Sequence, residues 1–247
     1  MTVGELISRL EHAIPEDLRL EWDNDGTMIL PDPERKVRAV LVALDATESV
    51  INEAIGRGYD MILTHHPLIF RPVRNLTDPR FISLIKSGVC VCSYHTRLDA
   101  LAGGVNDCLA GAIGLAHTEP FGEDGMGRIG YLSEPMSTSA LARHVKNALD
   151  APHVTVLDTH RPIYRLALLG GAGKEGIEQA AQAGADAYLT GEAGYNAVLD
   201  AEGRISVLLC GHEYTERPVL SYLADLVRSA EPGCRVTVWK RSLLDEY

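Results

Sequence analysis

Two adjacent histidines are the residues of this sequence best placed to do chemistry. In Leu63-Thr64-His65-His66-Pro67-Leu68, apolar residues typical of a strand lead into His65 and His66, and Pro67 stops a regular continuation. Ligand sites of open α/β sheets lie just beyond the carboxyl ends of strands. Because adjacent side chains of an extended backbone point to opposite sides, this pair suits two metal ions better than one. A pair of capping or core histidines is the alternative.

Two further histidines are each followed by a carboxylate four residues later. His95 precedes Asp99 and His212 precedes Glu216, and each pair comes directly after a predicted strand. This spacing places both groups on one face if the segment is helical. Mixed imidazole and carboxylate ligands suit Zn, Mn, Fe, Co or Ni. The other histidines lack such a partner, and we expect them at the surface: His12, His117, His144, His153 and His160.

Two other segments each leave two interpretations open. Gly170-Gly171-Ala172-Gly173-Lys174 follows a predicted strand and opens a helix, so its N–H groups could hold an anion. It lacks the spacing of a P-loop or a dinucleotide fingerprint, and a tight strand–helix turn is the alternative. Trp22-Asp23-Asn24-Asp25-Gly26 is either an exposed functional loop or a turn with an aromatic plug.

The elements that position these residues alternate between strand and helix, which predicts an α/β fold. Residues 115–127, rich in glycine and acid, are expected to form a loop or linker. The predicted strands cover 37–44, 61–64, 89–94, 128–132, 154–157, 164–169, 187–190, 205–209 and 235–239. The predicted helices cover the segment after Thr47, 79–86, 104–113, 139–149, 174–183 and 217–228.

Segments in the two halves of the chain are similar in sequence. Residues 58–66 resemble 184–192, and residues 91–99 resemble 208–216. One interpretation is two related α/β lobes whose strand ends share a cleft, with the candidate ligands there. The alternative is that any two βα units look alike.

Composition narrows the class of protein. The chain has 247 residues and a formal net charge of -11, which disfavours binding to nucleic acid through phosphates. No apolar stretch is long enough to span a bilayer, and the N-terminus lacks the pattern of a signal peptide. The five cysteines form no C-x-x-C pair, so we expect buried thiols in a reducing compartment, the cytoplasm.

Seven motifs together resemble the NIF3 family, also called DUF34 or YbgI, whose members are labelled GTP cyclohydrolase 1 type 2 homologues. They run in the family's order from about residue 20 to residue 217: WDNDG, VLVALDAT, LTHHPLIF, YHTRLDALAGGVNDCLA, GGAG, GADAYLTGE and GHEYTE. The sequence departs from the family pattern at Thr27, where an apolar residue is usual, and at Leu30, where a second glycine is common.

The resemblance implies a centre of two divalent metal ions whose ligands fall on His65, His66, Asp99, His212 and Glu216. It also implies one NIF3-like unit over residues 1–247 with no inserted domain. Lobe 1 would span about 1–114 plus the C-terminal segment and lobe 2 about 128–210, with the metal site in the cleft between them. The expected assembly is a toroidal homohexamer.

The implied activity is a hydrolase that opens the imidazole ring of guanine in GTP and releases formate. His95, close to the ligands but outside their set, is the candidate for proton transfer. A nucleotide phosphoester hydrolase needs the same metal chemistry, and a non-enzymatic metal-binding or scaffold protein is the alternative from another class. Neither nucleic acid nor a membrane is an expected partner.

Overall fold

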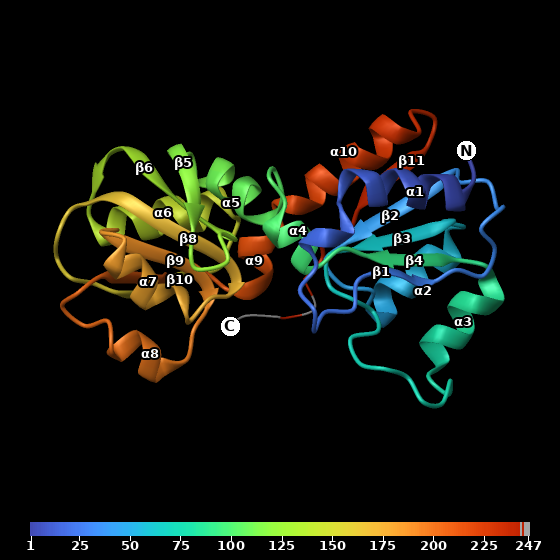
Figure 1. The fold of residues 1–247 in the computed structure, drawn as a ribbon, viewed down its shortest axis with the longest axis horizontal. Helices are drawn as coiled ribbons and strands as arrows, with labels where there is room; N and C mark the ends of the chain where they lie inside the picture. The colour runs from blue at the N-terminus through green and yellow to red at the C-terminus, as the bar shows by residue number, and fades with distance from the viewer. Residues whose placement is uncertain (243, 245–247) are drawn as a thin grey trace. The chain divides into compact units, whose positions relative to one another are not determined.

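The computed structural model describes residues 1–242 and 244 and has the predicted α/β architecture (Figure 1). The chain divides into two compact units, and each has its own sheet. Of the described residues, unit 1 comprises Met1–Leu101 together with 220–242 and 244, and unit 2 comprises Ala102–Val219. Along the described residues, no helix combines the length and apolar character that crossing a bilayer requires.

The sheet of unit 1 has five strands in the order β1-β4-β3-β2-β11. The strands are β1 (Gly26–Ile29), β2 (Ala39–Ala43), β3 (Met61–Thr64), β4 (Cys90–Ser93) and β11 (Arg235–Val238). Strands β11, β2, β3 and β4 are parallel, and β1 pairs with β4 in the antiparallel sense. Every residue of β2, β3 and β4 is buried, which explains why these segments read as unbroken apolar runs.

Several helices of unit 1 begin at residues whose side chains cap them. They are α1 (Val3–Ala13), α2 (Glu48–Gly56), α3 (Pro79–Ser87), α4 (Thr96–Ala100) and α10 (Val219–Ala230), with a short 3₁₀ turn over Glu16–Leu18. The Thr47 side chain caps α2, and Asp78 caps α3, which has Pro79 in its first turn. Apolar residues of α2 and α3 pack on β2, β3 and β4 to form a core.

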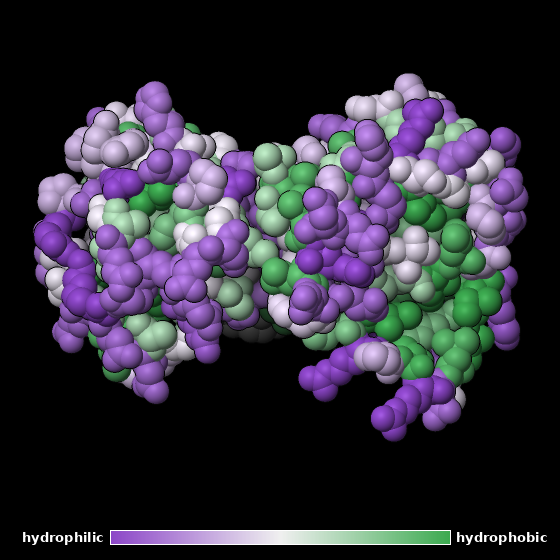
Figure 2. Space-filling model, viewed as in Figure 1, coloured by the Kyte–Doolittle hydropathy of each residue, from purple (hydrophilic) through white to green (hydrophobic). Residues whose placement is uncertain are grey.

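The loop between β3 and α3 is anchored at its start and exposed beyond it. Leu68 and Ile69 pack against the core of unit 1, whereas Phe70, Val73 and Leu76 are exposed. Figure 2 shows the resulting hydrophobic surface over α3 and this loop. The segment that follows the two histidines therefore has a defined place in the unit.

The sheet of unit 2 has six strands in the order β5-β6-β8-β9-β10-β7. The strands are β5 (Ala116–Phe121), β6 (Gly127–Met136), β7 (Thr155–Leu157), β8 (Ile163–Ala172), β9 (Ala187–Glu192) and β10 (Ser206–Leu209). Strands β8, β9 and β10 are parallel, and β5, β6 and β7 join in the antiparallel sense.

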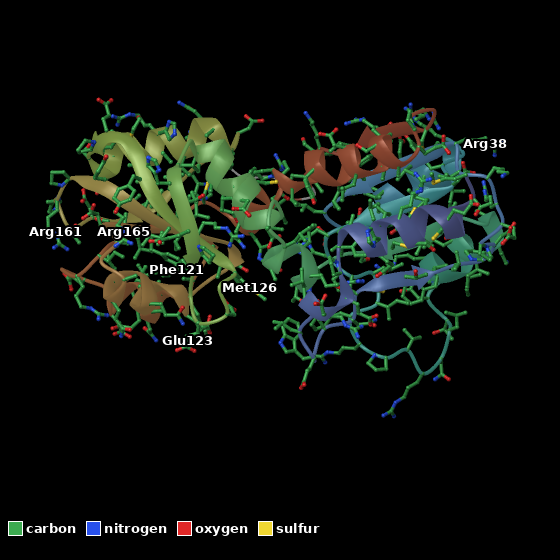
Figure 3. The ribbon with its side chains drawn as sticks, turned by 45° about the horizontal axis from the view of Figure 1, so that its top comes forward. Arg38, Phe121, Glu123, Met126, Arg161 and Arg165 are labelled. Atoms are coloured by element: carbon green, nitrogen blue, oxygen red, sulfur yellow. The ribbon has the colours of Figure 1, made fainter. Side chains whose placement is uncertain are left out.

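Helices cover both faces of this second sheet. They are α5 (Val105–Ile113), α6 (Thr138–Ala148), α7 (Gly176–Gln182), α8 (Tyr195–Leu199) and α9 (His212–Glu216). Helices α5 and α6 pack on the face that carries Leu189, and α7 and α8 pack on the face that carries Tyr188, because successive strand residues point to opposite sides. On that second face, the ring centroid of Phe121, which is labelled in Figure 3, lies 6.1 Å from the ring centroid of Tyr188.

Four features differ from the sequence expectations. The expected loop at 115–127 contains β5, an edge strand whose first five residues are exposed, so it carries no apolar signal. Strand β1 was not predicted, and β8 continues through Gly170 and Gly171 to Ala172. Helix α5 lies in unit 2, because Leu109 and Ile113 pack into the core of that unit.

Within each unit the repeated segments form the same substructure. Segments 58–66 and 91–99 hold the parallel neighbours β3 and β4, and segments 184–192 and 208–216 hold the parallel neighbours β9 and β10. An antiparallel strand flanks each pair, β1 beside β4 and β7 beside β10. The similarity in sequence therefore corresponds to a repeated arrangement of strands.

Candidate metal centre

The candidate ligands of unit 1 gather at the carboxyl ends of β3 and β4. His65 and His66 follow β3, and His95 is the N-cap of α4, which begins directly after β4. The register pairs Thr64 with Ser93, so the two strands end side by side. One ring nitrogen from each of the three histidines lies within 4.8 Å of the others, close enough for a shared metal ion.

Asp99 joins this cluster from the last turn of α4. One of its carboxylate oxygens, Oδ1, lies 3.6 Å from Nε2 of His65, whose side chain is fully buried. A neutral imidazole nitrogen and a carboxylate oxygen facing each other are both metal donors. Unit 1 thus brings together His65, His66, His95 and Asp99, as the sequence predicted.

The candidate ligands of unit 2 form a pair on α9. His212 and Glu216 are the first and last residues of this helix, and Nε2 of His212 lies 3.2 Å from Oε1 of Glu216. The predicted spacing on one helical face is therefore confirmed. Glu216 is buried, with 5% of its surface exposed. Helix α9 begins directly after β10 and so corresponds to α4 of unit 1.

Each of the four histidines has its other ring nitrogen, Nδ1, held by an oxygen. The distances from Nδ1 are 3.0 Å to the Tyr94 carbonyl for His65, 2.9 Å to Asp45 for His66, 3.0 Å to Asp23 for His95 and 2.9 Å to Glu192 for His212. Carbonyl and carboxylate oxygens accept hydrogen bonds, so we assign the proton to Nδ1 and the ligand lone pair to Nε2. Histidines that bind metals are oriented by such contacts. The donor set therefore fits a metal ion.

Gly171 is a glycine because the His212–Glu216 pair lies against it. Its φ is +68°, a left-handed conformation, and a Cβ at this position would overlap Oε1 of Glu216. Its N–H donates to Oγ1 of Thr215, and the Gly170 N–H donates to Oδ1 of Asn106. Since these N–H groups bond within the protein, the structure favours close backbone packing over the anion-binding interpretation of this segment.

The Trp22–Gly26 segment supports the histidine cluster. Asp23 accepts hydrogen bonds from Nδ1 of His95 and from both the backbone and the side chain of Thr96. Burial raises the pKa of Asp23, but these hydrogen bonds outweigh it and hold that pKa well below its ordinary value. Its carboxylate is therefore charged when it orients His95. Trp22 is exposed, which contradicts the interpretation of this segment as a turn with an aromatic plug.

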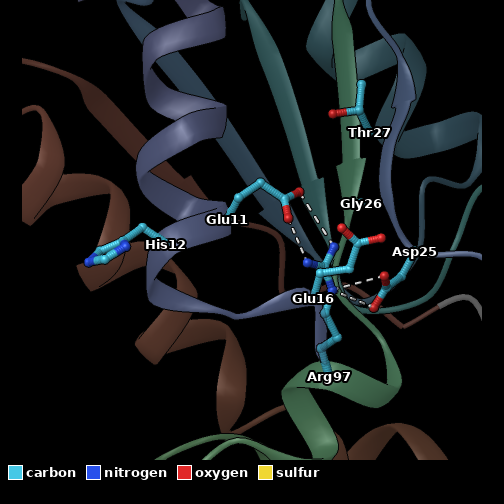
Figure 4. Close-up of a pocket in the computed structure, with 7 residues that line it drawn as sticks. All are labelled: Glu11, His12, Glu16, Asp25, Gly26, Thr27 and Arg97. Carbon is cyan, nitrogen blue, oxygen red and sulfur yellow. Dashed lines mark hydrogen bonds and ion pairs between the residues drawn. The ribbon is translucent and has the colours of Figure 1, made fainter. Parts of the chain in front are cut away.

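A buried arginine fixes the same segment to α4. Arg97 lies between Glu11 and Asp25, with ion-pair distances of 2.6 Å and 2.9 Å (Figure 4). These residues line a pocket of about 540 Å³ together with Gly26, whose φ is +94°. A Cβ on Gly26 would lie 3.0 Å from the guanidinium. The arginine therefore holds both the segment that orients His95 and the helix that carries Asp99.

Sequence reasoning missed the residues that orient the ligands. Asp45 and Glu192 each stand at the end of a strand that precedes a helix, so an acid at that position was the available signal. Asp23 lies 72 residues before His95, and nothing in the sequence pairs them.

Comparison with known proteins identifies the family and relatives of the same fold. A sequence profile of the family described as Duf34/NIF3 (NGG1p interacting factor 3) matches residues 1–243. A "GTP cyclohydrolase 1 type 2 homolog" of Clostridium perfringens is 33% identical over 241 residues and 92% of each chain. The "Protein NIF3 homolog" of Schizosaccharomyces pombe is 35% identical over 92% of this chain and 89% of the relative. Among solved structures, a hypothetical protein of Staphylococcus aureus matches with a TM-score of 0.91 at 26% identity, over 100% of this chain and 99% of the other.

Proposed function

Because the chain belongs to the Duf34/NIF3 family, we propose that it is a metal-dependent hydrolase acting on GTP. The observation that carries the proposal is the set of four histidines whose Nδ1 atoms are held by oxygens, which directs Nε2 toward a ligand role. The name "GTP cyclohydrolase 1 type 2 homolog" borne by relatives such as the Clostridium perfringens protein supports the choice of reaction.

The proposed centre holds two divalent ions. His65, His66 and Asp99 of unit 1 and His212 and Glu216 of unit 2 are the proposed ligands, in line with the family resemblance. Asp99 and Glu216 are the carboxylates of the set, and a carboxylate can bridge two cations, which a neutral imidazole cannot do. Zn, Mn, Fe, Co and Ni all suit such ligands.

The protein's own groups would bind and orient the substrate and move a proton. Bound divalent cations supply Lewis acidity, which lowers the pKa of a water molecule and stabilises developing negative charge. His95 is the proposed proton-transfer group, because the charged Asp23 fixes its Nδ1–H and stabilises the imidazolium that forms when Nε2 takes a proton. Water would add at C8 of guanine, the imidazole ring would open, and a second water would release formate.

His95 can also be a ligand, since its ring nitrogen lies in the same group as those of His65 and His66. The His95→Ala variant separates the two roles. Loss of about 10²-fold or more in rate with unchanged metal content supports proton transfer. Loss of metal content would make His95 a ligand.

The test of the function scores two products separately. Protein reconstituted with Zn, Mn, Fe, Co or Ni is analysed for bound metal and incubated with a panel of nucleotides, and formate and phosphate are measured. We expect about two ions per chain and formate release from GTP that stops with a chelator. Phosphate without formate would favour a phosphoester hydrolase, and metal binding without either product would favour a scaffold. His66→Ala should lower metal content, whereas His153→Ala, at an exposed position, should not.

The assembly remains a separate proposal. We propose a toroidal homohexamer because the sequence resembles the family, and sedimentation tests it. A species near the 26.8 kDa mass of one chain at micromolar concentration would contradict the ring.

A further inference from the structure

Two large aromatic side chains beside the histidine cluster of unit 1 are exposed. Trp22 has 61% of its surface accessible and Phe70 has 48%. Their rings meet edge to face, with centroids 6.1 Å apart. Each also meets the ring of His95, at 6.2 Å for Trp22 and 6.5 Å for Phe70. The two aromatic rings therefore form one rim of the cluster.

Hydrogen bonds hold this aromatic pair in place without burying it. The Asn24 side chain donates to the Ile69 carbonyl, which ties the segment carrying Trp22 to the loop carrying Phe70. Asp23 and Ile69, the neighbours of the two aromatic residues in sequence, are themselves anchored, Asp23 by Thr96 and Ile69 by the core. Exposed Trp and Phe side chains each forgo the stabilisation that burial provides. A rigid pair of exposed rings next to ligating histidines is suited to contact a planar ring.

The loop that carries Phe70 is also locally cationic. Residues 67–77 include Arg71 and Arg74 and no carboxylate, in a chain whose formal net charge is -11. Both arginines are exposed, and among residues 1–242 and 244 neither guanidinium makes an ion pair or a side-chain hydrogen bond. Such a loop attracts an anion to a surface that otherwise repels it.

We propose that Trp22 and Phe70 form a subsite that stacks the planar heteroaromatic ring of the substrate, while Arg71 and Arg74 attract its phosphates. A nucleotide joins such a ring to phosphates, so the subsite would supply the base-contacting element that no sequence motif revealed. The inference rests on the proposed function, because it concerns the substrate of the same histidine cluster. It assigns Trp22 and Phe70 to specificity and leaves proton transfer with His95.

Tryptophan fluorescence tests the stacking directly. The chain has two tryptophans, so Trp239→Phe leaves Trp22 as the single tryptophan, which is excited selectively. In the zinc-loaded protein, GTP and guanosine should quench this signal, and inorganic triphosphate should not. In the wild-type background, Trp22→Ala and Phe70→Ala should each raise the Kd for GTP by about 5- to 150-fold, the range for stacking one base on an aromatic ring. The zinc content and the affinity for inorganic triphosphate should stay unchanged.

A matched control uses another aromatic pair, in which one of the two rings is exposed. Tyr164 on β8 is 44% exposed and lies 5.3 Å from the Tyr131 ring, so Tyr164→Ala removes a similar group from unit 2. This variant should bind GTP as the wild type does. The double variant Arg71→Ala, Arg74→Ala should weaken GTP binding more than guanosine binding, because guanosine has no phosphates.

The possible failures are distinguishable. Unchanged GTP affinity in both Trp22→Ala and Phe70→Ala would overturn the subsite and leave the hydrolase intact. A change of sedimentation coefficient in Trp22→Ala would overturn it too, by assigning the rings to a contact between copies of the chain. If the zinc-loaded wild type bound neither GTP nor guanosine, the nucleotide substrate and the subsite would both be wrong. GTP binding weakened as expected but without formate release would support the subsite and contradict the hydrolase.

Discussion

Removal of the Asp45 carboxylate tests whether His66 binds metal through Nε2. Asp45 Oδ1 lies 2.9 Å from Nδ1 of His66 and fixes the orientation of that ring. In Asp45→Ala the ring loses this partner and is free to rotate. Metal binding would then have to fix the ring, which lowers the affinity. We therefore expect weaker zinc binding with little change in folding stability.

The size of the effect follows from how exposed the contact is. Loss of a group that orients a metal-binding histidine typically costs 10–100-fold in affinity. The Asp45 side chain is 53% exposed, so water can replace part of the hydrogen bond. We expect the low end, about tenfold, which is about 1.4 kcal/mol. Asp45→Asn should show a smaller loss, because the amide oxygen still accepts a hydrogen bond.

Competition with a chromogenic chelator measures the zinc affinity. Glu34→Ala removes the same charge at an exposed position of unit 1 and should bind zinc as the wild type does. Glu192→Ala is the equivalent change for His212, with Nδ1 of His212 2.9 Å from Oε1 of Glu192. It should cause a loss of similar size.

Two results would refute this reasoning. If Asp45→Ala kept the wild-type affinity, the Asp45 contact would not orient a ligand. If its affinity rose, Nδ1 of His66 would be the ligand atom that Asp45 masks.

Three further predictions concern stability and backbone packing. Arg97→Met should lower the free energy of unfolding by about 3–5 kcal/mol, because it leaves two carboxylates without their buried partner. Urea unfolding measures this loss, with Arg38→Met, at a 77% exposed side chain, as the control. A loss in Arg97→Met no larger than that in Arg38→Met would contradict the prediction. Gly171→Ala should lower metal content, because the added Cβ would crowd Glu216. Gly203→Ala, at a position with φ +71° and open space around it, should leave metal content unchanged. Equal metal content in both variants would contradict the crowding of Glu216. Burial raises the pKa of Asp60, but hydrogen bonds from backbone N–H groups and an arginine outweigh it and lower that pKa below 3.8. Stability from Asp60 is therefore present above the unfolded pKa and lost as pH falls through the folded pKa. Asp60→Asn should flatten the loss of stability at acidic pH, and an unchanged slope in denaturant unfolding would contradict it.

Much of the fold was readable because its signals are local. Parallel strands buried on both faces are continuous apolar runs, and β3 was predicted with the bounds that the structure has, Met61–Thr64. The edge strand β5 was not readable, because its first five residues, Ala-His-Thr-Glu-Pro, are exposed and give no apolar pattern. Helix α5 was expected in the first lobe but packs into the core of unit 2. Its sequence determines the helical periodicity but not the core on which the helix packs.

The candidate ligands were also local features. His212 and Glu216 belong to one short helix, and helical spacing brings their side chains together, while His95 caps the short helix that carries Asp99. His65 and His66 are adjacent at a strand end. The sequence could therefore name these residues and the class of metal that they suit.

What only the tertiary structure decided was how each ligand is held. The oxygens that orient His66, His95 and His212 come from residues 21, 72 and 20 positions away in the chain. Gly171 owes its identity to a pair on another element, and Trp22 and Phe70 meet through loops that lie far apart in sequence. Helical and strand periodicity relate residues only within one element. Contacts between elements depend on how strands pair and loops return, so the sequence supplied the candidate ligands and the folded chain supplied their orientation.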